Sequence, residues 1–180
     1  MNAASVTPAD APLADFTRCH LGIVSQLETL SELPELLEAA RRASTVAAQT
    51  VHLFQDNVLP HHADEEQELF PAVQRSARAG EEAAQVAAMA QRLTLEHRGI
   101  EAQWQQLAPA LRQAARGKPV LLDVPGLERL IRDYLSHARF EEQQYLPLAA
   151  RILTRDRNHL AALDLSLHIR HAVVPVQPYI

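Results

Sequence analysis

A motif that occurs twice places the strongest constraint on this chain. Residues 61–71 read HHADEEQELFP, and residues 137–147 read HARFEEQQYLP. Both begin with a histidine that is followed by a glutamate four residues later and a proline ten residues later. On an α-helix, residues four positions apart project from the same face. The pairs His61–Glu65 and His137–Glu141 therefore each direct an imidazole and a carboxylate toward one point.

A second pattern is also duplicated. The motif H-x-G-I-x-x-Q begins at His20 and again at His97, in each case about 40 residues before the longer motif. The chain thus reads as two copies of one unit, each with a lone histidine followed by a His–Glu pair. Self-similarity at a fixed period indicates a repeated architecture. We expect two helical hairpins related by an approximate two-fold axis.

The composition favours packed helices and narrows the functions. The 180 residues suit one domain, are rich in alanine and leucine, and include only five glycines and 4% aromatic residues. A net charge of −5 without a basic block argues against nucleic-acid binding. We find no signal peptide or membrane-length apolar run, so we expect a cytoplasmic protein. The single Cys19, which rules out an internal disulfide, is expected to be a small buried residue.

The spacing of apolar residues predicts an all-α, up-down-up-down antiparallel four-helix bundle with an internal two-fold pseudo-repeat and a short C-terminal extra helix. Start and stop signals predict helices over about 10–30, 34–79, 81–116 and 123–153. We expect a bend before His61 at Pro60, a C-cap at Gly80 and an N-cap at Asp123.

Three segments are expected along the chain: a disordered arm at 1–12, the bundle at 13–155, and a C-terminal helical appendage and tail at 156–180.

The duplicated residues form a candidate metal site with mixed nitrogen and oxygen ligands. Its members, one histidine from each helix and two carboxylates, are His20, His61, Glu65, His97, His137 and Glu141. This set exceeds what one tetrahedral zinc needs, and it favours iron, with manganese and zinc as competitors. Glu65 and Glu141 are natural bridges between two ions. We therefore predict two iron ions, Fe²⁺ or Fe³⁺, which an oxo or hydroxo group can also bridge.

Glu101 breaks the symmetry of the two copies. It stands four residues after His97, whereas its counterpart in the first copy is Val24. One interpretation makes Glu101 a seventh ligand on one side only. The other makes it a partly buried helix carboxylate paired with an arginine. The sequence leaves both open.

Several nearby polar residues receive less prominent predictions. His62 projects about 100° away from His61, so we expect it at the surface. Glu66 either supports the site or forms an outward salt bridge, and we favour the salt bridge. Trp104 is expected in the bundle interior. An accessory metal site and a solvated helix face are alternatives for the trio of Asp164, His168 and His171.

The ordered set of motifs resembles the hemerythrin-like (HHE cation-binding) domain. The resemblance covers about residues 13–153 and includes the E-x-x-L-F-P that follows the first pair. It implies an up-down four-helix bundle with a non-haem di-iron centre. It also implies a ligand role for the residues of the candidate site, which are His20, His61, Glu65, His97, His137 and Glu141.

The chain departs from oxygen-carrying hemerythrins at two positions. Glu101 replaces their second third-helix histidine, and Glu141 lies four residues after His137 where they have an aspartate five residues on. More carboxylate favours the ferric state. We therefore expect a binding protein for a small diatomic ligand, O₂ or NO, or for iron, that acts in sensing, storage or stress response. The alternatives are a di-iron oxidoreductase or iron donor in repair of nitrosative or oxidative damage, and a structural zinc site.

Overall fold

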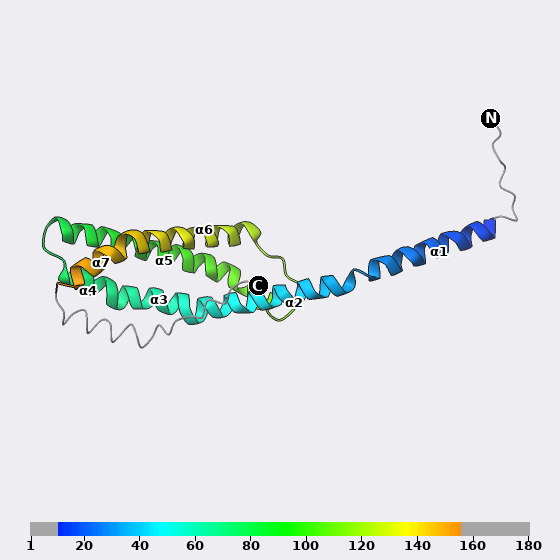
Figure 1. Cartoon of the computed structure of the whole chain (residues 1–180), viewed down its shortest axis with the longest axis horizontal. Coiled ribbons are helices and arrows are strands. Elements are labelled where there is room, and N and C mark those ends of the chain that lie inside the picture. Colours follow the sequence, from blue (N-terminus) through cyan, green and yellow to red (C-terminus); the bar gives the residue numbers. More distant parts are fainter. Residues whose placement is uncertain (1–10, 156–180) are drawn as a thin grey trace, which may run out of the picture. The chain divides into compact units, whose positions relative to one another are not determined.

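The computed structural model describes residues 11–155, and every regular element in that range is helical (Figure 1). The all-helical class expected from the sequence is therefore confirmed for the described residues. The chain divides into two compact units, Met1–Ser44 and Thr45–Ile180. The candidate metal-binding residues, except His20, belong to the second unit.

The two ends of the chain fall outside the described residues. Residues 1–10 of the arm expected at 1–12 lie there, whereas residues 11 and 12 begin α1. The appendage expected at 156–180 and the trio of Asp164, His168 and His171 also lie outside the described residues. Among the helices that the structure describes, none combines the length and apolar character needed to cross a membrane.

The first unit contains α1 (Ala11–Leu30) and the beginning of α2 (Leu33–His52). The break between them lies at Ser31, where the backbone N–H and the side-chain hydroxyl both donate to the Glu28 carbonyl, at 3.0 and 2.6 Å. The predicted turn before Pro34 is confirmed.

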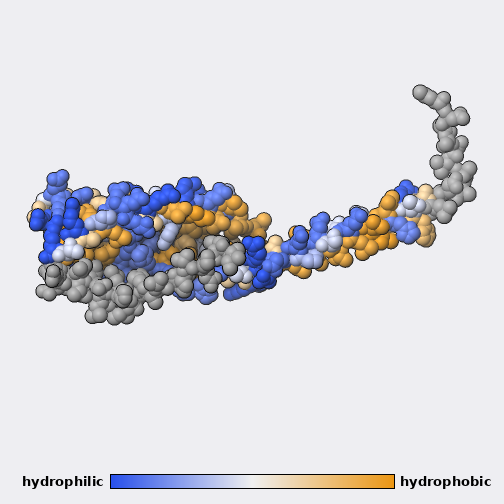
Figure 2. All heavy atoms as spheres, in the orientation of Figure 1, coloured by the Kyte–Doolittle hydropathy of each residue, from blue (hydrophilic) through white to orange (hydrophobic). Residues whose placement is uncertain are grey.

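Apolar side chains on α1 form the stripe that the periodicity predicts, and Figure 2 shows them along the helix. Phe16, Ile23, Val24 and Leu27 are each at least half exposed. Cys19 is exposed as well, so the expectation that it is buried is wrong. The described residues of the first unit form no buried core against which these side chains could pack.

Three π-helical turns interrupt the helices of the second unit, and each ends two residues before a proline. The turns are Leu53–Val58 (η1), Glu65–Leu69 (η2) and Glu141–Tyr145 (η3), and the prolines are Pro60, Pro71 and Pro147. In η2 the N–H of Phe70 donates to the Glu65 carbonyl, five residues earlier. Proline has no N–H, and its ring clashes with the carbonyl four residues before it in a regular α-helix. A wider turn removes the clash.

The long helix expected over 34–79 exists as one helical run from α2 through η1, α3 (Leu59–Asp64) and η2 to α4 (Phe70–Ser76). It ends at Ser76, and the next residue, Ala77, is extended. Gly80 was expected as the C-cap of this helix, but it directly precedes the next one instead. Its φ of 98° suits the loop, because glycine tolerates positive φ.

The remaining helices follow the expected order. They are α5 (Glu81–Ala114), α6 (Val124–Phe140) and, after η3, α7 (Leu146–Leu153). Asp123 caps α6 as expected, since its side chain accepts the Gly126 N–H at 3.0 Å. Helices α5 and α6 lie side by side and run in opposite directions (Figure 1).

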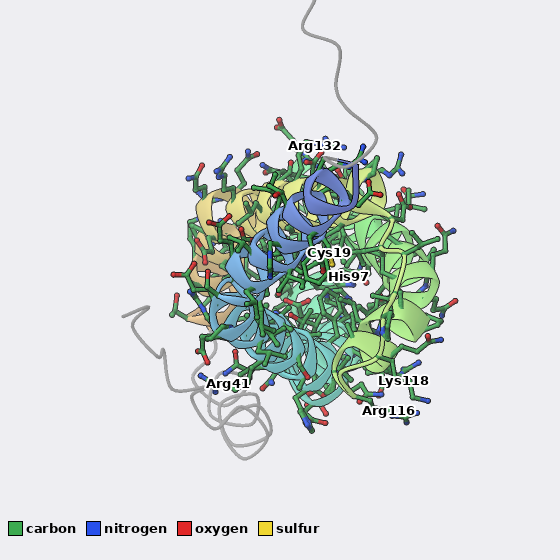
Figure 3. All side chains as sticks on the ribbon, turned by 90° about the vertical axis from the view of Figure 1, so that its right-hand side faces the viewer. Cys19, Arg41, His97, Arg116, Lys118 and Arg132 are labelled. Atoms are coloured by element: carbon green, nitrogen blue, oxygen red, sulfur yellow. The ribbon has the colours of Figure 1, made fainter. Side chains whose placement is uncertain are left out.

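Buried apolar side chains form two clusters on either side of His97 along α5. One cluster includes Val86, Ala90 and Leu93, and the other includes Ile100, Trp104 and Leu107. On α6, His137 likewise falls between Leu130 and Phe140. His97 itself, labelled in Figure 3, is fully buried. The two clusters therefore enclose a short polar layer, and Trp104 lies in the interior as predicted.

Candidate metal centre

Three buried imidazoles from three helices converge in the polar layer. His62 of α3, His97 of α5 and His137 of α6 are all at most 2% exposed. Their nearest ring nitrogens lie within 4.8 Å of one another. The rings of His62 and His97 are stacked, with centroids 3.9 Å apart and planes 7° apart. Three imidazole nitrogens at this spacing can share one metal ion.

A second group adjoins the first. His61, Glu65 and Glu141 also offer ligand atoms within 4.8 Å of one another. Nε2 of His61 lies 3.3 Å from Oε1 of Glu65, and the other oxygen, Oε2, lies 3.2 Å from Nε2 of His97. Oε2 of Glu141 lies 3.9 Å from Nε2 of His137. The two buried carboxylates therefore stand between the groups.

The prediction that His62 faces solvent is wrong. Its side chain is 1% exposed, whereas that of His61 is 40% exposed. The prediction took only the residue four positions before Glu65, His61, as its neighbour on the helix. The residue three positions before Glu65, His62, lies on the same face, so both histidines are neighbours of Glu65. The i, i+3 spacing of His62 and Glu65 is the signal that could have identified His62.

Several buried polar atoms of these groups have no hydrogen-bond partner. They are Nε2 of His62, Nε2 of His97 and both carboxylate oxygens of Glu65. The 3.2 Å approach of His97 to Glu65 lacks the geometry of a hydrogen bond. A buried polar atom without a partner costs roughly 1–3 kcal/mol. Nitrogen and carboxylate oxygen are ligands of iron, manganese and zinc, so a cation fits this donor set.

The opposite nitrogen of each buried imidazole contacts a carboxylate from outside the two groups. Nδ1 of His97 lies 2.8 Å from Glu66. Nδ1 of His62 lies 3.2 Å from Glu101, and Nδ1 of His137 lies 3.2 Å from Glu96. A carboxylate acceptor holds the proton on Nδ1, which leaves the lone pair on Nε2. This is the arrangement that orients histidine ligands in metal sites.

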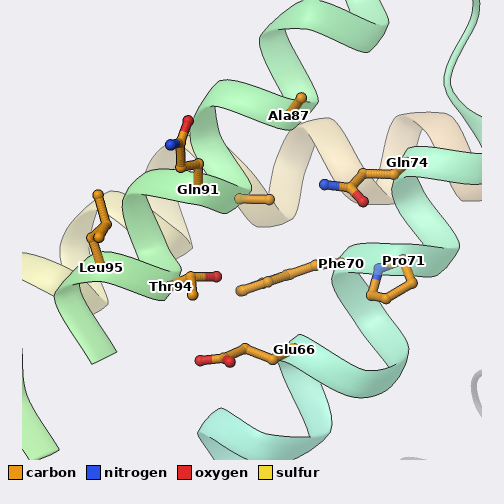
Figure 4. Close-up of a pocket in the computed structure, with 9 residues that line it drawn as sticks. Glu66, Phe70, Pro71, Gln74, Ala87, Gln91, Thr94 and Leu95 are labelled. Carbon is orange, nitrogen blue, oxygen red and sulfur yellow. The ribbon is translucent and has the colours of Figure 1, made fainter. Parts of the chain in front are cut away.

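The contacts of the nearby acids extend the network. Glu101 accepts a hydrogen bond from Arg98 at 3.1 Å and is absent from both ligand groups. Glu66 contacts both Arg98 and His97, so it forms the expected salt bridge and also supports the site. Glu66 additionally lines a pocket between η2–α4 and α5 (Figure 4). Sequence reasoning missed Glu96, because its partner, His137, is on another helix.

The buried charges suit a cation. Burial, and then the neighbouring Glu65, raises the pKa of Glu141. Burial opposes ionisation of Glu65, but His97 and Glu141 outweigh it and lower its pKa. Without metal, Glu141 is therefore the acid that keeps a proton near pH 7, and a cation would displace that proton. Burial, with the charges of His97 and His137, lowers the pKa of His62 to about 3, so this ring is neutral near pH 7.

His20 belongs to the first unit, whereas both ligand groups belong to the second. It lies on α1 in the first unit, where it is exposed and where its ring centroid is 5.8 Å from that of Phe16. The other candidates, which are His61, Glu65, His97, His137 and Glu141, come together in the second unit.

In this helical unit, a group of three histidines adjoins a group of one histidine and two glutamates. This arrangement is typical of helical metal-binding domains. The chain belongs to the hemerythrin family: the model of the hemerythrin HHE cation binding domain matches residues 11–149. Neither the curated proteins nor the solved structures contain a match. The resemblance seen in the sequence motifs is thus confirmed.

Proposed function

We propose that this chain is a non-haem di-iron protein that binds a small diatomic ligand, O₂ or NO, for sensing, storage or stress response. One metal position is formed by His62, His97 and His137. The other is formed by His61, Glu65 and Glu141. One observation carries the proposal. In both His62 and His97, Nε2 faces the interior without a hydrogen-bond partner, while Nδ1 contacts a carboxylate on the other side of the ring.

The four-helix bundle and the ligand role of His20 belong to this proposal. The family match begins at residue 11, so it includes α1. With α1, the described chain contains four helical segments: α1, the run from α2 to α4, α5, and the run from α6 to α7. His20 also begins the same H-x-G-I-x-x-Q motif as His97. We therefore retain His20 as a ligand of the second position, which has one imidazole, and the two-fold pseudo-repeat as the origin of the four segments.

The protein's own groups have three tasks in this function. The imidazoles and carboxylates hold the ions, and Glu66, Glu96 and Glu101 orient the imidazoles. The apolar clusters on either side of the polar layer shield the three buried imidazoles from water. When bound, a pair of iron ions supplies the redox-active site at which O₂ or NO binds. The unequal ligand sets make one position rich in nitrogen and the other rich in oxygen.

Metal analysis of the purified protein, with an electronic spectrum, tests the proposal. We expect two iron ions per chain and a spectral change when the anaerobically reduced protein meets O₂ or NO. Turnover of NO or O₂ with a reductant would instead support the di-iron oxidoreductase. One zinc and no iron would support a structural site, which the three-imidazole group also suits.

The sharpest variant is His62→Ala, because His62 is the ligand that the structure adds to the sequence motifs. We expect it to lose most of the metal at the three-imidazole position. The matched control is His52→Ala, which removes an exposed histidine paired with Asp56 at 3.2 Å. Metal content by mass spectrometry of the native protein checks this. Equal metal content in the two variants would remove His62 from the site.

A further inference from the structure

One arginine connects the supports of two buried imidazoles. Arg98 donates from Nη1 to Oε2 of Glu101 at 3.1 Å, and from Nη2 to Oε2 of Glu66. The other oxygen of each acid contacts an imidazole: Glu101 lies 3.2 Å from Nδ1 of His62, and Glu66 lies 2.8 Å from Nδ1 of His97. A guanidinium can hold two carboxylates in this way because its N–H donors have a fixed planar fork.

The third imidazole has a separate support. Nδ1 of His137 contacts Glu96 at 3.2 Å, and Glu96 in turn accepts from Nε of Arg92 at 2.7 Å. The guanidinium of Arg92 lies 3.6 Å above the centre of the Phe140 ring. The His137 support therefore shares no residue with the Arg98 network.

We propose that Arg98 is a positioning residue of the metal centre, which fixes the stacked rings of His62 and His97 through Glu101 and Glu66. This inference rests on the proposed metal-binding function. Arg98 itself is a surface residue, since its side chain is 56% exposed. It acts on the ions only through the four side chains that it connects.

An exposed salt bridge by itself contributes little, about 0–1 kcal/mol, to the free energy of folding. Removing Arg98 should therefore leave the fold intact. The effect should fall on the orientation of two rings, because each acid would keep its contact with an imidazole but lose the group that holds it in place. Loss of such outer contacts typically weakens metal binding about 10–100-fold.

The charge of Arg98 by itself predicts the opposite change in metal affinity. Arg98 carries a positive charge near the site, and its removal would strengthen the attraction for a divalent cation. The direction of the change in affinity thus separates positioning from charge alone. Arg98→Gln should bind Co²⁺, used as a spectroscopic probe, about 10–100-fold more weakly than the unmodified full-length chain. Arg98→Lys keeps the charge but loses the planar fork, so we expect an intermediate affinity.

The control is Arg155→Gln. Arg155 makes a two-pronged salt bridge with Glu82, at 2.7 Å for both contacts, and neither residue contacts an imidazole of the site. This variant loses a comparable surface pair and the same charge. We expect Co²⁺ affinity within about twofold of the unmodified protein, since surface pairs away from a site have small effects.

Nuclear magnetic resonance of the ring nitrogens provides a second readout that needs no metal. In Arg98→Gln the Nδ1–H signals of His62 and His97 should shift or broaden, because their acceptors become mobile. The signal of His137 should stay unchanged and serves as the internal reference. A merely structural role for Arg98 would move all three signals or none.

The outcomes are distinct. Equal or tighter Co²⁺ binding by Arg98→Gln, or equal losses in Arg98→Gln and Arg155→Gln, would overturn the role of Arg98. If the unmodified protein binds no metal ion, the proposed function fails, but the resonances of the metal-free protein still test whether Arg98 orients the two rings. Unchanged resonances in that case would overturn the inference as well.

Discussion

At the scale of single residues, the polar layer contains one histidine, His62, that stays neutral when buried. Burial lowers the pKa of His62 from 6.5 to about 3, and the charges of His97 and His137 act in the same direction. Its ring is therefore neutral in the folded chain at a pH where the unfolded chain already binds a proton. The group costs stability under mildly acidic conditions and keeps its lone pair for a metal near pH 7.

Because the pKa of His62 differs between the folded and the unfolded chain, the stability of the metal-free protein should depend on pH. Between pH 6.5 and about 3 the unfolded state binds one more proton at His62 than the folded state, so the free energy of unfolding falls as the pH falls. His97 shifts the other way, since Glu65 and Glu66 raise its pKa against the effect of burial. The comparison with His62→Leu, which lacks the titrating group, isolates the contribution of His62.

We expect His62→Leu to gain stability relative to the unmodified metal-free chain as the pH falls from 7 to 4. The gain should be a few kcal/mol, since each pKa unit corresponds to about 1.4 kcal/mol. Urea unfolding at several pH values measures it, with His52→Leu as the exposed control. A difference between variant and parent that does not change with pH would contradict the lowered pKa.

The sequence identifies most of the polar layer, and the parts that it misses share a physical cause. Repetition finds His61, Glu65, His97 and Glu141, because the spacing of residues within one helix is regular. Contacts between helices follow no such spacing. Glu96, on α5, supports a histidine of α6, and only the packing of the two helices reveals this.

At the scale of elements, the π-helical turns place the motif's acids. Both η2 and η3 begin at the glutamate of a repeated motif, Glu65 or Glu141, and end two residues before a proline. The sequence predicts helices here from apolar periodicity and caps, and their approximate ends are correct. The spacing of apolar residues does not reveal the π-helical turns. Each of these two turns is only five residues long, so one additional residue in the turn hardly changes the apolar spacing.

The element-scale prediction concerns Pro71. Pro71→Ala restores an N–H that can bond the carbonyl four residues earlier, so η2 should tighten toward a regular α-helix. Tightening rotates Glu65 relative to α4. We expect metal affinity to fall about tenfold, as for other changes that misplace a ligand, while the metal-free fold is kept. Co²⁺ titration and circular dichroism measure the two effects.

The control for this change is Pro109→Ala. Pro109 lies inside α5, outside all three π-helical turns and remote in sequence from the motif's acids. Its replacement has the same effect on local helix propensity. If Pro109→Ala weakened Co²⁺ binding as much as Pro71→Ala, the link between the proline, the wide turn and the position of Glu65 would be refuted.

At the scale of the whole molecule, the polar layer divides the apolar interior of the second unit into two clusters. Three helices, α3, α5 and α6, each contribute one imidazole to the same point. Without a cation, the layer holds buried atoms without partners, each of which costs roughly 1–3 kcal/mol. A metal ion would remove that cost and connect the three helices. The stability of the unit should therefore depend on metal more than on any one apolar contact.

This coupling predicts the result of adding and removing metal. A ligand that binds only the folded state at 100 times its dissociation constant adds about 2.7 kcal/mol. For a chain of this size, that corresponds to a rise of about 5–10 °C in Tm. We expect Fe²⁺ under anaerobic conditions, or Co²⁺, to produce this rise in scanning calorimetry, and a chelator to reverse it. The rise should continue with the logarithm of free metal concentration and should shrink in His62→Ala but not in His52→Ala. A Tm that does not change with metal in the unmodified chain would mean that the polar layer is stable without a cation. The Nε2 atoms that have no hydrogen-bond partner would then need a different explanation.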